Sequence, residues 1–558
     1  MRTSQANLHR SPGIRWQPAC SFLLLFACIH VPWAALRPLA APDEIRYAEI
    51  AREMLATGDW IVPHLAGAPY LEKPPLGIWL GALAQALCGR SPIALRLPAL
   101  LSTLITGLLL ARFLRQRGRG AREAWGTASI FASLAFVQAI GSAHVLDPLL
   151  SCALAGATLA FASGAMASNP SERRAALWRA GLWLGAAFLV KGFVAVALLL
   201  AAALPFGLLS PGGRNALRGL PWMLGTAVLL ALPWGLAIAH QEPLFWHRFF
   251  WVEHVQRFLH RGEAQHSEPI WYFLPVLIGG ALPWLPLLGL ARSRSPLDAE
   301  LHPVARLAGC WVLGPLLFLS ASSGKLGTYL MPCFPGLALG IGCLLHRRAV
   351  EIRPGVRIGL RALGLAVALG TGAVIYACVL RKHSALHLPD PSMWSALLWS
   401  IGGLGSSWLF WRAARAASAR QLRRRVAWCL VPLGCAAALA FPRSIQGWRQ
   451  PERTLSRHLD WLRSTDTLFA EYRLLVSLCW SLGTTEIELV DKSGELDSRR
   501  LHLPLSISAL NLRLQGEASR QICLVCRASW WNDHARELPE PAATFEDEGI
   551  VFARFATR

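Results

Sequence analysis

The chain has 558 residues, of which 54% are hydrophobic and only 16% are charged. This composition is too apolar and too poor in charge for an ordinary soluble protein, so we predict an integral membrane protein. The net charge of +22 would favour nucleic-acid binding in a soluble chain. Here the arginines lie in short loops between apolar runs, where they indicate membrane topology, and no nucleic-acid partner is expected.

Apolar runs of roughly the length that crosses a bilayer as a helix, about 17 to 25 residues, recur between Ala19 and Phe441. They predict a polytopic α-helical protein with about 13 transmembrane helices. The predicted spans are residues 19–36, 95–114, 124–141, 146–166, 176–190, 192–209, 219–239, 270–290, 303–320, 328–346, 358–380, 393–411 and 426–441. The run from Pro75 to Cys88 is shorter, which indicates an interfacial or re-entrant helix.

Arginine-rich loops set the predicted orientation, because positively charged loops stay in the cytoplasm. The N-terminal tail and the segments 112–122, 173–179 and 412–425 carry such clusters. An odd number of spans then places the C-terminal segment on the opposite side, together with the loop that follows the first span. In a bacterium, this predicts an inner-membrane protein whose chemistry-bearing loops face the periplasm. The first span has no A-x-A cleavage site, so we predict an uncleaved anchor.

The chain divides by composition into a predicted transmembrane domain, 1–442, and a predicted soluble domain, 443–558. Apparent strands alternate with helical stretches in the second part, which predicts a small α/β domain. The predicted strands are 467–472, 485–490, 521–527 and 549–555, and the predicted helices are 473–482 and 506–514. Cys523 and Cys526 form a CxxC motif within a predicted buried strand, where positions i and i+3 face opposite ways. This favours a structural role over redox or metal chemistry.

The loop after the first span, residues 43–79, gathers acids, bases, paired prolines and aromatic residues. From Tyr47 onward, apolar residues recur with helical spacing, which predicts an amphipathic helix on the membrane surface. The opposite face of this helix carries Arg46, Glu49, Arg52 and Glu53. Asp43 comes just ahead of Tyr47, and it is either a helix cap or, with its neighbour Glu44, part of a catalytic group.

Cations in the same loop point to phosphate chemistry. An enzyme that acts on a lipid phosphate needs a cationic pocket at headgroup depth, because the phosphate cannot enter hydrocarbon whereas its isoprenoid tail can. Arg46 and Lys73 have the charge and the position for this role. The alternative is that each long cation snorkels to anionic headgroups and binds no substrate.

Three further segments carry residues with two interpretations. Asp147, directly before Pro148, is either a helix cap or a second acid. In the segment 244–261, helical spacing groups His247, His254, Arg257 and Arg261 along one face. This face is either a phosphate or metal site built from His254 and Arg257 or part of an ordinary interfacial helix. Lys325 and Tyr329, at i and i+4, reach a common helical face, but a snorkelling cation and a membrane-belt tyrosine explain them equally well.

The chain resembles the bacterial polyprenyl-phosphate-dependent glycosyltransferases of the GT-C class, most closely the aminoarabinose transferases that modify lipid A, which are related to the protein O-mannosyltransferases. The resemblance rests on motifs that run along nearly the whole chain. They are DExRYAEIAREM at 43–54, GDW at 58–60, YLEKPPLxxW at 70–79, RLPAL at 96–100, VLDPLL at 145–150, FLVKG at 188–192, FFWVEHVQRF at 249–258, KLGTYLMPCFP at 325–335 and, more weakly, GELD at 494–497.

The resemblance implies the GT-C fold, periplasmic juxtamembrane helices in the first loop, a soluble periplasmic C-terminal domain and an undecaprenyl-phosphate-linked sugar as donor. It also implies site residues. The catalytic residues would be Asp43, Glu44 and Asp147. The substrate-binding residues would be Arg46, Tyr47, Tyr70, Lys73, Lys191, Arg257, Lys325 and Tyr329. Glu72 and His254 would form a pair of ligands for a divalent metal such as zinc, magnesium or manganese, and no organic cofactor is expected.

The expected reaction is therefore transfer of 4-amino-4-deoxy-L-arabinose from undecaprenyl phosphate to lipid A, with inversion at the sugar. Two alternatives stay open at this point. One is transfer of another sugar, such as hexose or mannose, to a protein or another glycolipid. The other is a polyprenyl-lipid flippase or transporter, although such proteins place ionisable groups near the bilayer midplane and often show repeated halves.

Overall fold

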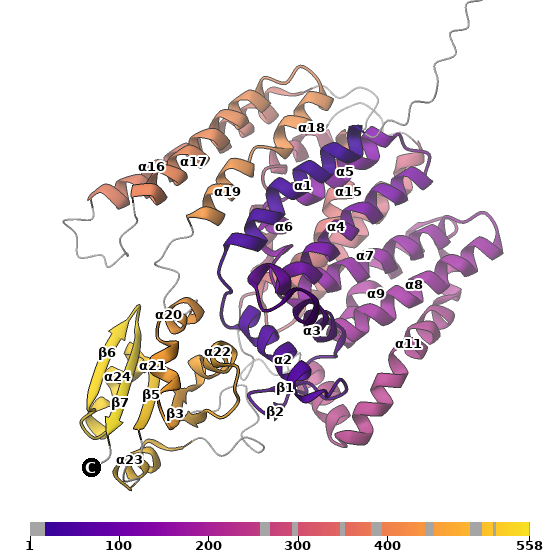
Figure 1. The fold of residues 1–558 in the computed structure, drawn as a ribbon. Helices are drawn as coiled ribbons and strands as arrows, with labels where there is room; N and C mark the ends of the chain where they lie inside the picture. The colour runs from indigo at the N-terminus through magenta and orange to yellow at the C-terminus, as the bar shows by residue number, and fades with distance from the viewer. Residues whose placement is uncertain are drawn as a thin grey trace, which may run out of the picture.

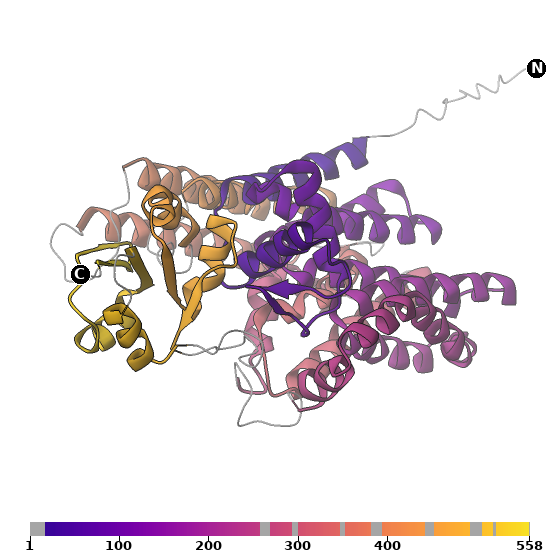
Figure 2. The same ribbon diagram turned by 60° about the horizontal axis from the view of Figure 1, so that its bottom comes forward.

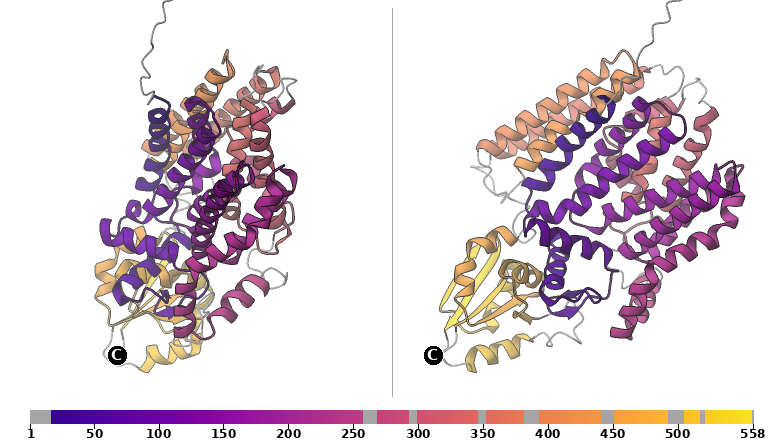
Figure 3. Two further views of the ribbon diagram at one scale, coloured as in Figure 1. Left: turned by 90° about the vertical axis from the view of Figure 1, so that its right-hand side faces the viewer. Right: turned by 45° about the vertical axis from the view of Figure 1, so that its right-hand side comes forward.

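The structure is a computed structural model that describes residues 17–256, 268–292, 299–345, 352–380, 393–440, 451–491, 505–516 and 521–556. A bundle of long helices makes up most of the molecule, and a small domain built on a sheet lies against one end of it (Figure 1). The elements of the first loop lie between these two parts, as the views in Figures 2 and 3 also show.

The bundle contains helices from both halves of the chain. They are α1 (Gln17–Leu36), α4 (Pro92–Gln116), α5 (Ala121–Ser133), α6 (Ala135–Ile140), α7 (Leu146–Ala165), α8 (Pro170–Lys191), α9 (Phe193–Leu209), α10 (Gly213–Arg218), α11 (Leu220–Gln241), η1 (His247–Gln256), α13 (Phe273–Gly280), η2 (Leu285–Arg292), η3 (Ala299–Leu301), α14 (His302–Ala321), η4 (Gly327–Cys333), α15 (Phe334–Leu345), α16 (Pro354–Leu380), α17 (Met393–Ala414), α18 (Ala419–Ala427) and α19 (Val431–Leu439).

Within the described residues, 7 helical segments are long and apolar enough to cross a membrane. They are Gln17–Leu36, Pro92–Gln116, Leu146–Ala165, Leu220–Gln241, Ala299–Ala321, Gly327–Leu345 and Pro354–Ala373. Each of these coincides with a predicted span. The polytopic helical class is therefore confirmed, whereas the predicted number of 13 spans is not.

Some predicted spans are interrupted. The span predicted over 124–141 is divided into α5 and α6, because Leu134 is extended between them. The amide freed by this break, that of Ala135, donates to the carbonyl of Leu282, 2.7 Å away. The span predicted over 270–290 is divided into α13 and η2, and Pro283 and Pro286 in this region lack the amide hydrogens that a continuous α-helix needs.

The first loop folds into α2 (Asp43–Thr57), a two-stranded hairpin of β1 (His64–Leu65) and β2 (Ala68–Pro69), and α3 (Leu76–Cys88). Sequence patterning predicts both helices and misses the hairpin. The apolar face of α2 is buried, as expected. Part of its polar face is also covered, because the C-terminal part of the chain packs over α2: Glu49 is fully buried and Glu53 nearly so. The predicted helix is confirmed, and its position on the membrane surface stays a prediction.

The C-terminal part is an α/β fold with one five-stranded sheet in the order β4-β3-β5-β7-β6. Its elements are α20 (Pro451–Arg457), α21 (Leu459–Arg463), β3 (Thr467–Glu471), α22 (Tyr472–Leu482), β4 (Glu488–Val490), α23 (Ile507–Gly516), β5 (Gln521–Arg527), α24 (Ala528–His534), η7 (Ala535–Glu537), β6 (Ala543–Asp547) and β7 (Ile550–Ala556). Strand β3 pairs in parallel with β4 and β5, and β7 is antiparallel to β5 and β6. The four predicted strands are confirmed, and β6 was missed.

The two cysteines of β5 lie on opposite faces of the sheet, and one of them belongs to a hydrophobic cluster that the sheet shares with the helix bundle. Cys523 and Cys526 of β5 are both buried and pack into different hydrophobic clusters, which confirms that they face opposite ways. The cluster that contains Cys523 continues through α22 and α2 into the helix bundle. Helix α22 thus packs directly against α2, and the two-domain division at residue 443 stays a prediction.

Candidate active site

Asp43 is the first residue of α2, and its side chain does not cap that helix. The residue at the cap position is Pro42, and no side-chain capping hydrogen bond is present there. Asp43 instead pairs with Arg46 one turn later, with 2.7 Å between Oδ1 and a guanidinium nitrogen, and 38% of its side chain remains exposed. The capping interpretation was therefore wrong, and the carboxylate is accessible for contact with another molecule.

Tyr47 lies one turn into the same helix and is buried. Burial raises the pKa of its hydroxyl, and the carboxylates of Asp43, Asp147 and Glu72 raise it further. Carboxylates from three positions in the chain therefore act on one phenol, and Arg46 acts on it in the opposite direction. The structure brings together residues from α2, the first loop and α7 that sequence analysis had assigned to one site.

The start of α7 and the end of α8 are joined by an ion pair. Lys191 Nζ lies 2.6 Å from Asp147 Oδ1, and both side chains are largely buried. The same ammonium lies 4.4 Å from the centre of the Tyr329 ring, a cation–π contact with η4. Lys191 also interacts electrostatically with Asp43. These contacts connect four elements at one end of the bundle.

The segment that leaves the hairpin carries the remaining described residues of the predicted site. The Tyr70 hydroxyl donates to Glu72 Oε2 across 3.5 Å, and Lys73 Nζ lies 3.7 Å from the same oxygen. Glu72 and Lys73 each keep 19% of their side chain exposed. They form an accessible acid–base pair beside Tyr47.

The prediction that Lys325 and Tyr329 share one helical face assumed a regular α-helix, and the structure has none at this position. Lys325 precedes η4, a 3-10 helix that begins at Gly327, so an α-helical i, i+4 relation to Tyr329 does not apply. Its ammonium donates to the carbonyl oxygens of Ser322, at 2.5 Å, and Glu268, at 2.9 Å. These bonds tie together two loops, and substrate binding by Lys325 stays a prediction.

The segment predicted to supply His254 and Arg257 differs from the expected α-helix. Residues His247–Gln256 form a π-helix, in which positions i and i+7 do not return to the same face. The predicted stripe through His247 and His254 is therefore wrong as a geometric argument. Arg257 and the side chain of His254 lie outside the described residues. An aromatic hollow lies beside this helix, and its lining residues are Phe193, Trp246, His247, Phe250 and Trp251.

The predicted metal pair is not tested by the described residues, because the side chain of His254 lies outside them. No group of three or more His, Cys, Asp or Glu side chains suitable for a metal ion occurs in this part of the chain. Glu72, the one predicted ligand whose side chain is described, has Tyr70 and Lys73 beside its Oε2. An ammonium group at that distance competes with a bound cation, so we derive no chemical step through a metal.

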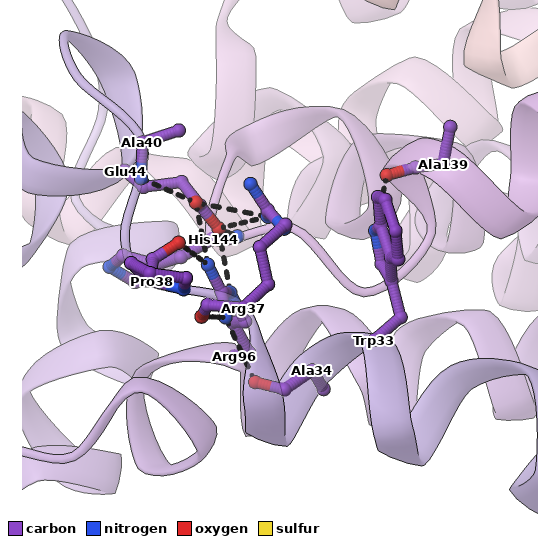
Figure 4. Close-up of polar contacts among 9 residues, drawn as sticks. All are labelled: Trp33, Ala34, Arg37, Pro38, Ala40, Glu44, Arg96, Ala139 and His144. Carbon is purple, nitrogen blue, oxygen red and sulfur yellow. Dashed lines mark hydrogen bonds and ion pairs between the residues drawn. The ribbon is translucent and has the colours of Figure 1, made fainter. Parts of the chain in front are cut away.

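Glu44 was predicted to be catalytic, but its carboxylate is enclosed (Figure 4). Oε1 accepts from Arg96 Nε at 2.8 Å and from the His144 amide at 2.8 Å, and Oε2 accepts from the Ala40 amide at 2.8 Å. Arg37 and Arg96 also form ion pairs with it. With both oxygens occupied and only 3% of the side chain exposed, Glu44 holds neighbouring elements in place and does not offer a group to a substrate.

Arg96 is the most enclosed member of this group, with no exposed side-chain surface. Besides Glu44, its guanidinium donates to the carbonyl oxygens of Ala34, Arg37 and Pro38. Arg96 therefore satisfies the carbonyls at the end of α1 while it neutralises an acid on α2. Sequence analysis used Arg96 as part of a motif but gave it no role. An arginine within an apolar span was the available signal.

Loss of the Lys191 charge is expected to destabilise the folded protein by about 3–5 kcal/mol, because Asp147 would be left buried without its partner. We would measure thermal unfolding in detergent for Lys191→Met and for the double change with Asp147→Asn. The double variant removes both charges and should recover most of the lost stability. Equal stabilities of the single and double variants would contradict this prediction.

Comparison with known proteins connects this geometry to a family. Residues 18–249 match the family described as dolichyl-phosphate-mannose-protein mannosyltransferase. The undecaprenyl phosphate-alpha-4-amino-4-deoxy-L-arabinose arabinosyl transferase of Erwinia tasmaniensis is 33% identical over 525 residues, which cover 93% of this chain and 92% of that protein. The chain belongs to this arabinosyl transferase family. The member from Pectobacterium carotovorum is 35% identical over 482 residues, or 85% of each chain.

Solved structures show that the arabinosyl transferase fold extends over the whole chain. The crystal structure of ArnT from Cupriavidus metallidurans bound to undecaprenyl phosphate aligns with a TM-score of 0.79 at 21% identity, covering 97% of this chain and 98% of that one. The structure of the same protein in the apo state aligns with a TM-score of 0.74 at 22% identity, covering 96% and 98%. The expected GT-C fold is confirmed, and the chain is a membrane glycosyltransferase.

Proposed function

We propose that the protein transfers 4-amino-4-deoxy-L-arabinose from undecaprenyl phosphate to a phosphate group of lipid A, with inversion at the anomeric carbon. The observation that carries this proposal is the cluster of Asp43, Glu72, Asp147 and Lys191 around Tyr47 at one end of the bundle. The cluster supplies both anionic and cationic groups. In a member of the arabinosyl transferase family, a site of this composition suits a cationic amino sugar attached to a phosphate.

The donor is recognised by charge at one end and by apolar surface at the other. Lys73 is accessible and is our main candidate for contact with the donor phosphate, together with Arg257 of the predicted set. Phe193, which lines the aromatic hollow, lies two residues after Lys191 in the chain. The aromatic lining of the hollow suits an isoprenoid chain, which prefers hydrocarbon to water. The two features would hold the phosphate near the acids while the tail stays in the membrane.

In the proposed reaction, the bond between the sugar's anomeric carbon and the donor phosphate oxygen breaks, and undecaprenyl phosphate leaves with the bonding electrons. An oxygen of the lipid A phosphate forms the new bond from the opposite side of the sugar. Cations near the leaving phosphate lower the barrier by stabilising its developing charge. Because the acceptor phosphate is already anionic, no strong base is required. Asp43 would then orient the acceptor or bind the amino group of the sugar.

We also propose that the site and the C-terminal part face the periplasm of a bacterial inner membrane. The support is the distribution of arginine, which is concentrated in the loops at the end of the bundle away from α2 and α3. A site on that face would act on a donor and an acceptor that are both presented at the outer leaflet.

The test is a transfer assay with purified protein in detergent. The protein would be incubated with undecaprenyl-phosphate aminoarabinose and lipid A, and the mass of the lipid A would be measured by mass spectrometry. A gain equal to one aminoarabinose residue supports the proposal. Parallel reactions with a polyprenyl-phosphate hexose and a peptide acceptor test the alternative raised by the mannosyltransferase match. Transfer only in those reactions would replace the proposed substrates.

A metal requirement remains a proposal that rests on the predicted pair Glu72 and His254. If this pair holds a divalent ion that the reaction needs, prolonged treatment with a chelator lowers the turnover rate and added zinc restores it. Glu72→Gln should then show the same loss without restoration by zinc. Unchanged turnover after chelation, with metal content verified by elemental analysis, would remove the metal from the reaction.

A further inference from the structure

Glu53 of α2 makes a pair of contacts with the hairpin of the first loop. Its Oε1 accepts a hydrogen bond from the Ala66 amide at 2.6 Å, and its Oε2 accepts one from the Gly67 amide at 3.0 Å. Only 2% of Glu53 is exposed. One carboxyl group thus takes both amides at the tip of the turn.

The turn that Glu53 holds has a demanding backbone conformation. Ala66 has a φ of 52° and Gly67 a φ of 79°, and a positive φ is unfavourable for a residue with a Cβ such as Ala66. Two hydrogen bonds to consecutive amides offset part of that cost. The sequence lacks the Asn-Gly or Asp-Gly pair that forms such turns unaided. The conformation of this hairpin therefore depends on α2.

The hairpin determines where the next segment begins. Strands β1 and β2 pair antiparallel, with His64 opposite Pro69, and the Tyr70 amide then bonds to the carbonyl of Pro63 across 2.7 Å. The accessible pair Glu72 and Lys73 begins two residues after Tyr70. A shift of the turn relative to α2 would move this pair relative to Asp43, which lies on α2 itself.

We propose that Glu53 is a positioning residue of the transferase site, which fixes the segment carrying Lys73 against the helix carrying Asp43. The inference rests on the proposed function for its kinetic consequence, but the contact itself does not depend on it. Glu53 touches no reacting atom in this arrangement. It acts through the turn at Ala66 and Gly67.

The groups around Glu53 affect the ionisation of its carboxyl group. Burial and the neighbouring Glu49 carboxylate raise the pKa of Glu53 to about 7, against the lowering effect of the two amide donors. Arg52 of α2 binds Glu49 at 2.7 Å. Further groups that act on these charges are Cys479 of α22 and Arg90 of the loop before α4. A protonated Glu53 can donate to Glu49, and glutamine likewise carries no charge but keeps one acceptor oxygen in place of two.

The kinetic test compares Glu53→Ala and Glu53→Gln with the wild type. In Glu53→Ala, we expect kcat/KM for the donor to fall by roughly 10- to 100-fold, since small misplacement of a substrate-binding group has effects of this size. Glu53→Gln should recover part of that loss, because its amide oxygen still accepts from one of the two turn amides, whereas its NH₂ cannot accept from the other. Glu172→Gln, at an exposed position on α8, is the control for a simple loss of one acid.

The structural test does not require turnover. Hydrogen–deuterium exchange followed by mass spectrometry should show faster exchange over residues 64–73 in Glu53→Ala than in the wild type, with the bundle helices unchanged. Unchanged exchange there, or wild-type kinetics in a folded Glu53→Ala variant, would overturn the inference. If the wild type transfers no aminoarabinose, the proposed function fails, and the exchange result still decides whether Glu53 holds the hairpin.

A pH scan gives a further readout. Because the pKa of Glu53 is raised in the folded protein, its contribution to stability is fully present below the ordinary value of 4.5 and is lost as the pH rises through about 7. Wild-type protein should therefore melt at progressively lower temperature across this window. Glu53→Gln should lack this part of the pH dependence. An identical slope in both proteins would show that Glu53 does not titrate at the hairpin.

Discussion

Replacement of Asp43 by Asn is expected to lower kcat for sugar transfer by about 10²-fold, because the acceptor or the amino group of the sugar would no longer be held in its reacting position. The change keeps the size of the side chain and removes its charge. Asp43 is accessible, is electrostatically coupled to Lys191, and makes no helix-capping bond. Its position therefore favours a role in the reaction over a role in folding.

Asp43→Asn should remain folded, so a loss of turnover would report on the reaction and not on unfolding. The pair between Asp43 and Arg46 is partly exposed, and pairs of this kind contribute no more than about 1 kcal/mol. We would measure transfer to lipid A by mass spectrometry and thermal unfolding on the same preparations. Asp533→Asn, at an exposed position in α24, is the matched control. Normal turnover in a folded Asp43→Asn variant would remove Asp43 from the mechanism.

Removal of the Glu44 charge is expected to cost about 3–5 kcal/mol of folding stability, because Arg37 and Arg96 would be left as buried cations without an anion. Burial acts to raise the pKa of Glu44, but Arg96 and Arg37 lower it to about 2 overall. The stability from this group is thus present above the ordinary value of 4.5 and is lost as the pH falls toward 2. Glu44→Gln therefore loses stability at neutral pH.

The measurement is thermal unfolding in detergent, with the yield of folded protein as a second readout. Arg96→Met should behave like Glu44→Gln, since it removes the guanidinium that binds the acid and three backbone carbonyls. Arg115→Met, at an exposed position of the same helix α4, is the control and should leave stability unchanged. A stable Glu44→Gln variant without activity would instead return Glu44 to the catalytic residues.

The two acidic neighbours at the start of α2 show where sequence reasoning reaches its limit. The motif identifies Asp43 and Glu44 together, because both are acids in a charged loop behind a membrane span. Their side chains point in different directions from the helix, and one is 38% exposed while the other is 3% exposed. Which of the two is free for chemistry depends on Arg96, which is 52 positions away from Glu44 in the chain.

The segment around Lys325 gives a second example. Sequence patterning assumes a regular α-helix, so Lys325 and Tyr329 are assigned to one face. The structure has a 3-10 helix that begins only at Gly327, and Tyr329 meets Lys191 of α8 instead. Periodicity predicts which residues share a face only when the type of helix is known. The local pattern does not give that type, and η4 is packed here against the helices α7 and α14.

The sequence by itself determined the polytopic membrane class, the α/β character of the C-terminal part and the loop that carries the site. These properties follow from local composition and periodicity, which act over a few neighbouring residues. Tertiary structure alone decided that Glu44 is enclosed, that Glu53 holds the hairpin, and that Asp43, Asp147 and Lys191 lie together. The physical reason is that burial and charge pairing depend on contacts between elements distant in the chain, which no local pattern records.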